Sequence, residues 1–388
     1  MKPSSLAVDF TRKMIQIEST DPGTCEKDMA DWLTRQLSPL PGVRLTREEV
    51  LPGRPNLMAE LPGPDDTPAL VMICHMDTVV VGDGWTMDPF AAYEKDGLIY
   101  GRGACDMKSG LACCLSAFTA AAGQLHESGI PARRKLKLIC TMDEEDFMRG
   151  SEACIRSGWV TDKDWIIDAE PTDGRIQASH KGRTWYEIEV QGHTAHASTP
   201  WKGADAIAAM AEIIRSVRLD IQAAPSHPDM GTSTVTFGQI TGGYRPYVVP
   251  DSCKLWIDMR PVPPLNTEKT NQIVEKAIQT AMIEVPGVSV SYRITGDRPS
   301  IEKDPDSLLL AHLKKACTNI TSRETEVTCF TGYTDTAVIA GQLHNHNCMS
   351  YGPGNLEAAH QPDEWVAVED IIRCEKVYIE LIQLTVLS

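Results

Sequence analysis

The sequence predicts an α/β protein with a mainly parallel sheet, into which a second, α+β domain of ferredoxin-like order is inserted. Three short apolar runs, at residues 69–75, 135–143 and 165–170, read as buried strands separated by helical patterns. Buried strands that alternate with helices are typical of a parallel sheet. From residue 180 to 296 the strands alternate between apolar and polar residues, which indicates a different kind of unit. A chain of 388 residues is long enough for two such domains.

The first segment contains helices and strands in alternation. Apolar spacing predicts helices at residues 5–17, 26–37 and 107–123. A turn is expected at Asp21-Pro22-Gly23, between the first two of these helices. A further strand is expected around Asn56–Glu60, before the buried strand at 69–75.

The inserted segment has the order β-α-β-β-α-β, which is that of a ferredoxin-like unit. Its elements are expected at residues 185–192, 203–218, 233–243, 253–260, 267–284 and 288–295. Candidate site residues Glu170 and His360 lie on either side of this segment. The first domain must therefore be discontinuous, with residues 1–179 and 297–388 in one unit and 180–296 in the other.

Composition and charge narrow the class of protein. A net charge of −16 argues against nucleic acid as a partner, because such proteins usually carry a basic face. No apolar run approaches the length of a membrane span, and the N-terminus lacks a signal-peptide core. We therefore expect a soluble, cytoplasmic protein without membrane contact. Twelve cysteines without a C-x-x-C pair indicate buried, reduced thiols rather than a zinc finger.

Two histidines and several carboxylates form a candidate metal site. They lie in five segments spread along the chain: CHMDT, YGRGACDMKSG, TMDEED, IIDAEPT and EAAHQPDEW. Several of them follow predicted strands, and ligands of α/β sheets bind at the carboxyl ends of strands. Oxygen and imidazole ligands without thiolates suit Zn, Mn or Co. The candidates are His75, Asp77, Asp106, Glu144, Glu145, Glu170 and His360.

Taken singly, these residues also have structural interpretations. His75 and Asp77 share a face of a strand end, but an isolated H-x-D is more typical of a surface His near a turn Asp. Asp106 precedes a predicted helix and could be its N-cap. The acidic run at 143–146 could be a solvated loop. It follows a buried strand, however, and neighbouring carboxylates repel one another unless a cation or solvent relieves them.

With these segments in this order, the sequence resembles the M20 metallopeptidase/deacylase family over essentially its whole length. The nearest branch is that of acetylornithine deacetylase and succinyl-diaminopimelate desuccinylase. The resemblance implies two divalent metal ions, with Zn expected and Co or Mn as alternatives. Asp106 would bridge the two ions, with His75 and Glu170 completing one site and Glu145 and His360 the other.

The resemblance also implies roles for residues beside the metals. Glu144 would be the general base that activates a metal-bridging water for attack on the amide carbonyl. Asp77 would orient His75. In GHTAHAS at 192–198, His196 would stabilise the oxyanion, commonly in the partner subunit's active site. Its alternative interpretation is a turn residue at a strand end.

Two of the three substrate-binding candidates lie in the inserted segment. Arg260, in WIDMRP, matches a family arginine that would pair with a substrate carboxylate, although a surface arginine is the simpler interpretation. Tyr247, in GGYRPYVVPD, stands where the family usually has Asn. Gly332 is a third candidate. The resemblance further implies a homodimer formed through residues 180–296.

The segment GPGNLEAAHQPDEW at 352–365 is most similar to the acetylornithine deacetylase branch. We therefore expect removal of a small acyl group from an N-acyl amino acid. A dipeptidase or carboxypeptidase acting on dipeptides, or succinyl-diaminopimelate desuccinylase, is the alternative enzyme. A non-catalytic protein that binds amino-acid derivatives is the alternative from another class. The presence of Glu144 and all proposed ligands argues against that class.

Overall fold

The computed structural model describes residues 5–387, and the chain divides into two compact units. The first unit contains the chain up to Ala178, Glu302–Thr328 and the chain from Thr334 onward. The second contains Ser179–Ile301 together with Cys329–Tyr333. The expected fold class, an α/β unit with an inserted antiparallel unit, is confirmed.

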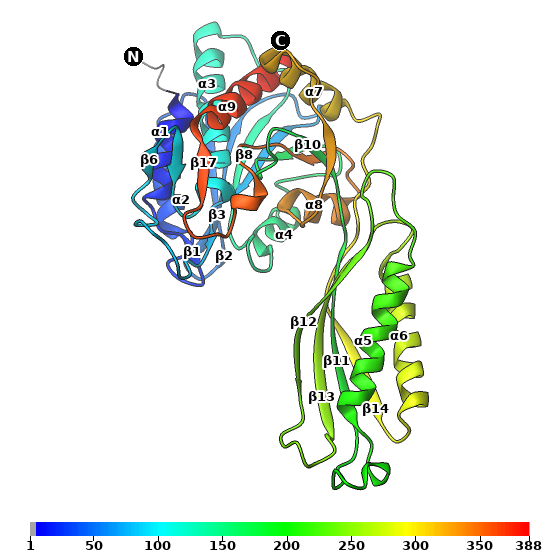
Figure 1. Cartoon of the computed structure of the whole chain (residues 1–388). Coiled ribbons are helices and arrows are strands. Elements are labelled where there is room, and N and C mark those ends of the chain that lie inside the picture. The colour runs from blue at the N-terminus through cyan, green and yellow to red at the C-terminus, as the bar shows by residue number, and fades with distance from the viewer. Residues whose placement is uncertain (1–4, 388) are drawn as a thin grey trace. The chain divides into compact units, whose positions relative to one another are not determined.

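An eight-stranded sheet forms the centre of the first unit, in the order β15-β10-β16-β9-β4-β8-β3-β2 (Figure 1). Its strands are β2 (Arg44–Leu51), β3 (Arg54–Leu61), β4 (Leu70–His75), β8 (Leu136–Thr141), β9 (Trp165–Asp168), β10 (Ile176–His180), β15 (Val327–Phe330) and β16 (Cys348–Ser350). The central strands β8, β4, β9 and β16 are parallel. Antiparallel pairing appears only outward from them, at β3 and β2 on one side and at β10 on the other.

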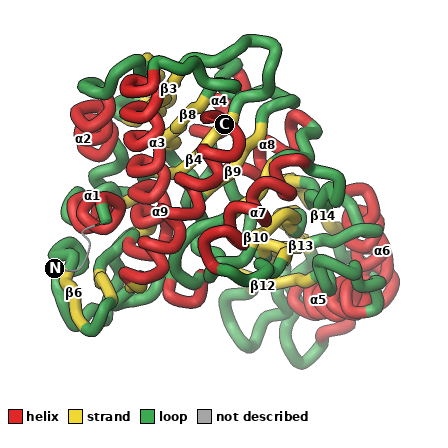
Figure 2. Tube along the Cα trace, turned by 90° about the horizontal axis from the view of Figure 1, so that it is seen from above, coloured by secondary structure: helices red, strands yellow, loops and turns green. Residues whose placement is uncertain are grey.

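Helices cover this sheet (Figure 2). They are α1 (Leu6–Ile15), α2 (Lys27–Leu37), α3 (Ser109–Ser128), α4 (Arg149–Arg156), α7 (Leu308–Thr321), α8 (Asp335–Leu343) and α9 (Val368–Ile382). The main core lies where α1, α3, α7 and α9 pack together, and it includes Leu70, Met72 and Cys74 of β4. Because side chains alternate along a strand, His75 points to the other side of the sheet from Cys74.

Two small sheets complete the first unit. One pairs β1 (Thr20–Asp21) with β5 (Thr78–Val79), and the other joins β17 (Trp365–Ala367), β7 (Leu98–Tyr100) and β6 (Tyr93–Lys95). The first of these brings the segment after α1 beside the loop that follows β4.

The second unit has the expected β-α-β-β-α-β order. Its elements are β11 (Arg183–Gln191), α5 (Ala206–Gln222), β12 (Thr234–Gly242), β13 (Ser252–Arg260), α6 (Thr267–Glu284) and β14 (Ser289–Arg298). The strands form an antiparallel sheet in the order β12-β13-β11-β14. Alternate residues of β11, including Tyr186 and Ile188, pack with Ile213 of α5 and Val274 of α6 in a separate core.

All twelve cysteines are free thiols, and ten of them are buried. Across residues 5–387, no helix combines the length and the apolar character that crossing a membrane requires.

Candidate metal centre

Three adjacent parallel strands place the first candidate ligands at one edge of the sheet. β4 ends at His75, β8 leads into Glu144 and Glu145, and β9 leads into Glu170. Because β4 lies between β8 and β9, these side chains converge, as expected from the strand order. Asp106 comes from the turn Ala104–Lys108 before α3, and His360 comes from the loop after Leu356–Ala358.

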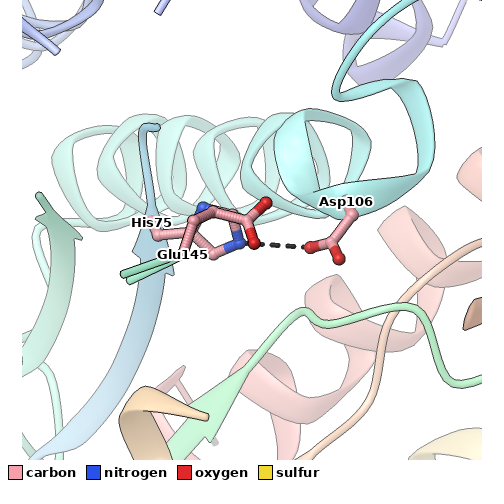
Figure 3. A group of neighbouring side chains, drawn as sticks. All are labelled: His75, Asp106 and Glu145. Carbon is pink, nitrogen blue, oxygen red and sulfur yellow. Dashed lines mark hydrogen bonds and ion pairs between the residues drawn. The ribbon is translucent and has the colours of Figure 1, made fainter. Parts of the chain in front are cut away.

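The carboxylate of Asp106 lies between the two histidines. Its Oδ1 is 3.2 Å from Nε2 of His75, and its Oδ2 is 3.4 Å from Nε2 of His360. Nε2 of His75 is also 3.8 Å from Glu170, and Nε2 of His360 is 3.0 Å from Oε2 of Glu145. Figure 3 shows the side chain of Asp106 directed at His75 and Glu145. Two groups of donors thus meet at one carboxylate.

Two overlapping sets of donor atoms have spacing suited to a metal ion. In each set the atoms lie within 4.8 Å of one another: His75 with Asp106 and Glu145, and His75 with Glu144 and Glu170. His75 is 1% exposed, whereas the side chain of His360 is 49% exposed. The site is therefore closed at the sheet and open to solvent beside His360.

Burial and mutual repulsion shape the electrostatics of this site. Burial raises the pKa of Glu144 well above its usual value, and the charges of Asp335 and Glu145 add to this against the opposing effect of His75. Burial also raises the pKa of Glu170, again with help from neighbouring carboxylates. Hydrogen bonds to Asp106 and Glu145 raise the pKa of His360 to about 10. Divalent cations among these oxygens would relieve the repulsion, so the donor set fits metal ions.

Asp77 contacts three of the candidate site residues: Glu144, Glu145 and His75. Its carboxylate accepts hydrogen bonds from the backbone N–H groups of Glu144 at 3.2 Å and Glu145 at 3.1 Å. Its backbone carbonyl is 2.9 Å from Nδ1 of His75, whereas its Oδ1 is 3.7 Å away. A carbonyl oxygen only accepts, so Nδ1 carries a proton and Nε2 is the nitrogen available to a metal ion. In the structure, Asp77 contacts His75 mainly through its backbone.

Glu364 holds the turn that carries Asp106 and was not singled out from the sequence. Its Oε1 accepts hydrogen bonds from the N–H groups of Cys105 at 2.8 Å and Asp106 at 3.0 Å, and its Oε2 pairs with Arg102 at 2.6 Å. The N-cap interpretation of Asp106 is wrong, because α3 begins after Lys108 without a side-chain cap. The only sequence signal for Glu364 was its place four residues after His360 in AAHQPDEW.

Residues of the second unit show local geometry that bears on their predicted roles. Nδ1 of His196 accepts a hydrogen bond from the N–H of Ser198 at 3.2 Å, so in the neutral ring Nε2 carries the proton. The N–H of Ala197 donates to the carbonyl of Tyr247 at 3.1 Å, which places these two segments side by side. Tyr247 is exposed.

Arg260 and Gly332 also belong to the second unit. The guanidinium of Arg260 makes two hydrogen bonds to the carboxylate of Asp258, at 2.8 and 2.9 Å. A side chain at Gly332 would run into the ring of Phe330, 2.7 Å from the position of its Cβ. The metal-ligand, catalytic and substrate roles of all these residues remain predictions.

Comparison with known proteins places this geometry in a family. The model of peptidase family M20/M25/M40 matches residues 71–384. The acetylornithine deacetylase of Myxococcus xanthus is 30% identical over 317 residues, 80% of this chain and 78% of the relative. A probable succinyl-diaminopimelate desuccinylase of Staphylococcus aureus (strain MSSA476) is 28% identical over 356 residues, 84% and 85% of the two chains.

The solved structures show the same fold. A tripeptidase from Staphylococcus aureus subsp. aureus Mu50 superposes with a TM-score of 0.80 at 21% identity, covering 98% of both chains. Because the family model matches most of the sequence, the relationship extends across both units. The chain belongs to the M20/M25/M40 peptidase family and is a metal-dependent hydrolase of that family.

Proposed function

We propose that this hydrolase removes a small acyl group from an N-acyl amino acid, in the manner of an acetylornithine deacetylase. The observation that carries the proposal is the position of Glu144, whose carboxylate lies within 4.8 Å of donor atoms of His75 and Glu170. Glu144 is buried, and burial raises the pKa of its carboxyl group, which favours uptake of a proton from a neighbouring water molecule. The relationship to an acetylornithine deacetylase supports the acyl-group assignment.

Five residues would hold two divalent ions, expected to be Zn with Co or Mn as alternatives. His75 and Glu170 would hold one ion, Glu145 and His360 the other, and Asp106 both. Two such ions, when bound, lower the pKa of a water molecule and polarise a carbonyl oxygen. Glu144 would accept the proton of the attacking water and then donate it to the leaving amine nitrogen. Asp77 would keep Glu144 and Glu145 in place through their backbone N–H groups.

The second unit would supply the substrate contacts. The Nε2–H of His196 is a suitable donor to an oxyanion, and Tyr247 lies on the neighbouring segment. Arg260 would bind the α-carboxylate of the amino acid, and that carboxylate would compete with Asp258 for the guanidinium. Gly332 would leave space for the substrate. These roles follow the family resemblance, and the tautomer of His196 supports the first of them.

We further propose that a homodimer forms through residues 180–296 and that His196 acts in the partner's active site. The sheet of the second unit ends at β12 and β14, which are edge strands. Ile240 of β12 is 51% exposed and Ile294 of β14 is 39% exposed. Unpaired edges with apolar residues are suited to pairing with another chain.

A substrate panel tests the assignment. Purified protein would be loaded with Zn, Co or Mn, and release of free amine measured from N-acetylornithine, other N-acetyl amino acids, N-succinyl-diaminopimelate and several dipeptides. The proposal predicts that acetylated amino acids have the highest kcat/KM. Preference for the succinyl substrate would favour the desuccinylase relative, and preference for dipeptides would favour a dipeptidase or carboxypeptidase. Tight binding without turnover of any of them would favour the non-catalytic alternative.

A further inference from the structure

The loop after β8 is held by side chains from distant parts of the chain. Four successive backbone N–H groups, from Met142 to Glu145, each donate to a side-chain oxygen. Their acceptors are Asn56 at 3.1 Å, Glu26 at 3.1 Å, and the two oxygens of Asp77 at 3.2 and 3.1 Å. Asp143 has a φ of 67°, which is uncommon for a residue other than glycine. The loop therefore adopts an unfavourable backbone conformation that its neighbours must stabilise.

Glu26 and Asp77 are the two buried carboxylates among these acceptors. Glu26 lies just before α2 and is fully buried. Oxygens of Glu26, Asp21 and Asp77 lie within 4.8 Å of one another, which is spacing that could also suit a metal ion. Buried carboxylates this close need a compensating positive charge.

Arg54 provides that charge. Its Nε donates to Oε2 of Glu26 at 2.8 Å, and its Nη2 reaches Asp21 at 2.6 Å. Nη2 also bonds the Glu26 oxygen that accepts from the N–H of Asp143. Nη1 lies 3.5 Å from the buried carboxylate of Asp143 itself. A planar guanidinium can contact several carboxylates at once, so Arg54 offsets part of the negative charge of Glu26, Asp21 and Asp143.

We infer that Glu26 and Arg54 are positioning residues that hold the 142–145 loop so that Glu144 and Glu145 face the metal centre. The inference rests on the proposed function of those two glutamates. Neither Glu26 nor Arg54 belongs to the proposed ligand set. Glu26 acts through the backbone N–H of Asp143, and Arg54 acts through Glu26 and the carboxylate of Asp143. A misplacement of about 1 Å at a catalytic group can lower a rate by about 100-fold, so loss of this support reaches the chemistry.

Four variants and one control test the inference. Arg54→Met and Glu26→Ala remove the support, whereas Arg54→Lys and Glu26→Gln keep part of it. Arg47→Met is the matched control, because Arg47 lies on the neighbouring strand β2 and makes an exposed ion pair with Asp31. For each protein, KM and kcat would be measured, with kcat expressed per metal-loaded site. The affinity for Co²⁺ and the visible absorption of the Co²⁺ form would be measured as well.

Arg54→Met and Glu26→Ala should lower kcat by about 10- to 100-fold with little change in KM, and weaken Co²⁺ binding by a similar factor. They should also change the Co²⁺ absorption, since Glu145 moves. Arg54→Lys and Glu26→Gln should recover part of both effects, and Arg47→Met should match the wild type.

If both severe variants kept their kcat and Co²⁺ absorption and lost only thermal stability, the role would be merely structural and the inference wrong. If the severe variants did not fold, the same comparison would be made with Arg54→Lys and Glu26→Gln.

Failure of the proposed function would be distinguishable from failure of this inference. If the wild type hydrolysed no substrate, Co²⁺ affinity and absorption would still test the inference. Values equal to those of the wild type in Arg54→Met and Glu26→Ala would overturn it.

Discussion

The carboxylate of Asp106 is 3.4 Å from Nε2 of His360, although the two residues lie in different segments of the first unit's sequence. The inserted unit separates them along the chain, and the turn before α3 and a C-terminal loop bring them together. The other oxygen of Asp106 is 3.2 Å from His75. A single carboxylate thus joins donors from the N-terminal and C-terminal parts of the unit.

Replacement of Asp106 is expected to affect both metal positions at once. Asp106→Ala should reduce bound metal from two ions per chain to fewer than one and lower kcat by at least about 10³-fold, because both positions share this side chain. Elemental analysis after gel filtration would measure the metal content. Asp96→Ala is the control, because Asp96 is exposed in the turn between β6 and β7. Two tightly bound ions in Asp106→Ala would contradict the bridging role.

Glu364 should influence metal affinity without being a ligand. Glu364→Gln weakens the acceptors for the N–H groups around Asp106 and removes the charge that pairs with Arg102. We expect metal affinity or kcat to fall by about 10- to 100-fold. Glu357→Gln, at an exposed position before His360, should leave both unchanged. Equal metal affinities in the two variants would show that the Asp106 turn needs no such support.

Arg260 is expected to act on substrate affinity. Arg260→Ala should raise KM for N-acyl amino acids by about 10-fold or more, because a charged hydrogen bond contributes about 1.5–3 kcal/mol. An amide-blocked substrate without the α-carboxylate should respond much less. Asp258→Asn should lower KM for the free acid, since the guanidinium would no longer be shared with Asp258. A KM unaffected by Arg260→Ala would remove Arg260 from the substrate site.

His180 should make folding sensitive to mild acid. Burial lowers the pKa of His180 to about 3, and neither ring nitrogen has a hydrogen-bond partner among the described residues. The unfolded chain binds a proton below about pH 6.5 and the folded chain does not, so stability is full above that pH and decreases as the pH falls toward 3. The loss is about 1.4 kcal/mol per pH unit within this window.

Chemical denaturation of the wild type and His180→Phe at pH 7.5 and pH 5.0 would measure this effect. The free energy of unfolding of the wild type should fall relative to that of His180→Phe when the pH is lowered from 7.5 to 5.0. Parallel losses in both proteins would assign the acid sensitivity to other groups.

Much of the fold could be predicted because the strands are strongly patterned. The runs at 69–75, 135–143 and 165–170 became β4, β8 and β9, and all six elements of the inserted unit appeared in the expected order. The helix expected at 107–123 begins instead at Ser109 and continues to Ser128. Its start could not be predicted, because the turn before it is held by Glu364, a tertiary contact without periodicity.

The site could be predicted only in part. Strand ends explained why His75, Glu144 and Glu170 should meet, but the bridging arrangement of Asp106 came from the family resemblance. Glu26 and Arg54 could not be found from the sequence, because a buried ion pair between a loop and a strand leaves no local pattern. Such contacts depend on which elements the fold brings together, and that requires the structure.

The most direct test of the account is to measure metal content and kcat together for Glu144→Ala. The account predicts two bound ions, as in the wild type, with kcat lower by about 10²–10⁴-fold, because the variant would lose the proton-transfer group and keep the metal ligands. Loss of metal in this variant would make Glu144 a ligand rather than a base. Unchanged kcat with full metal content would contradict the proposed mechanism.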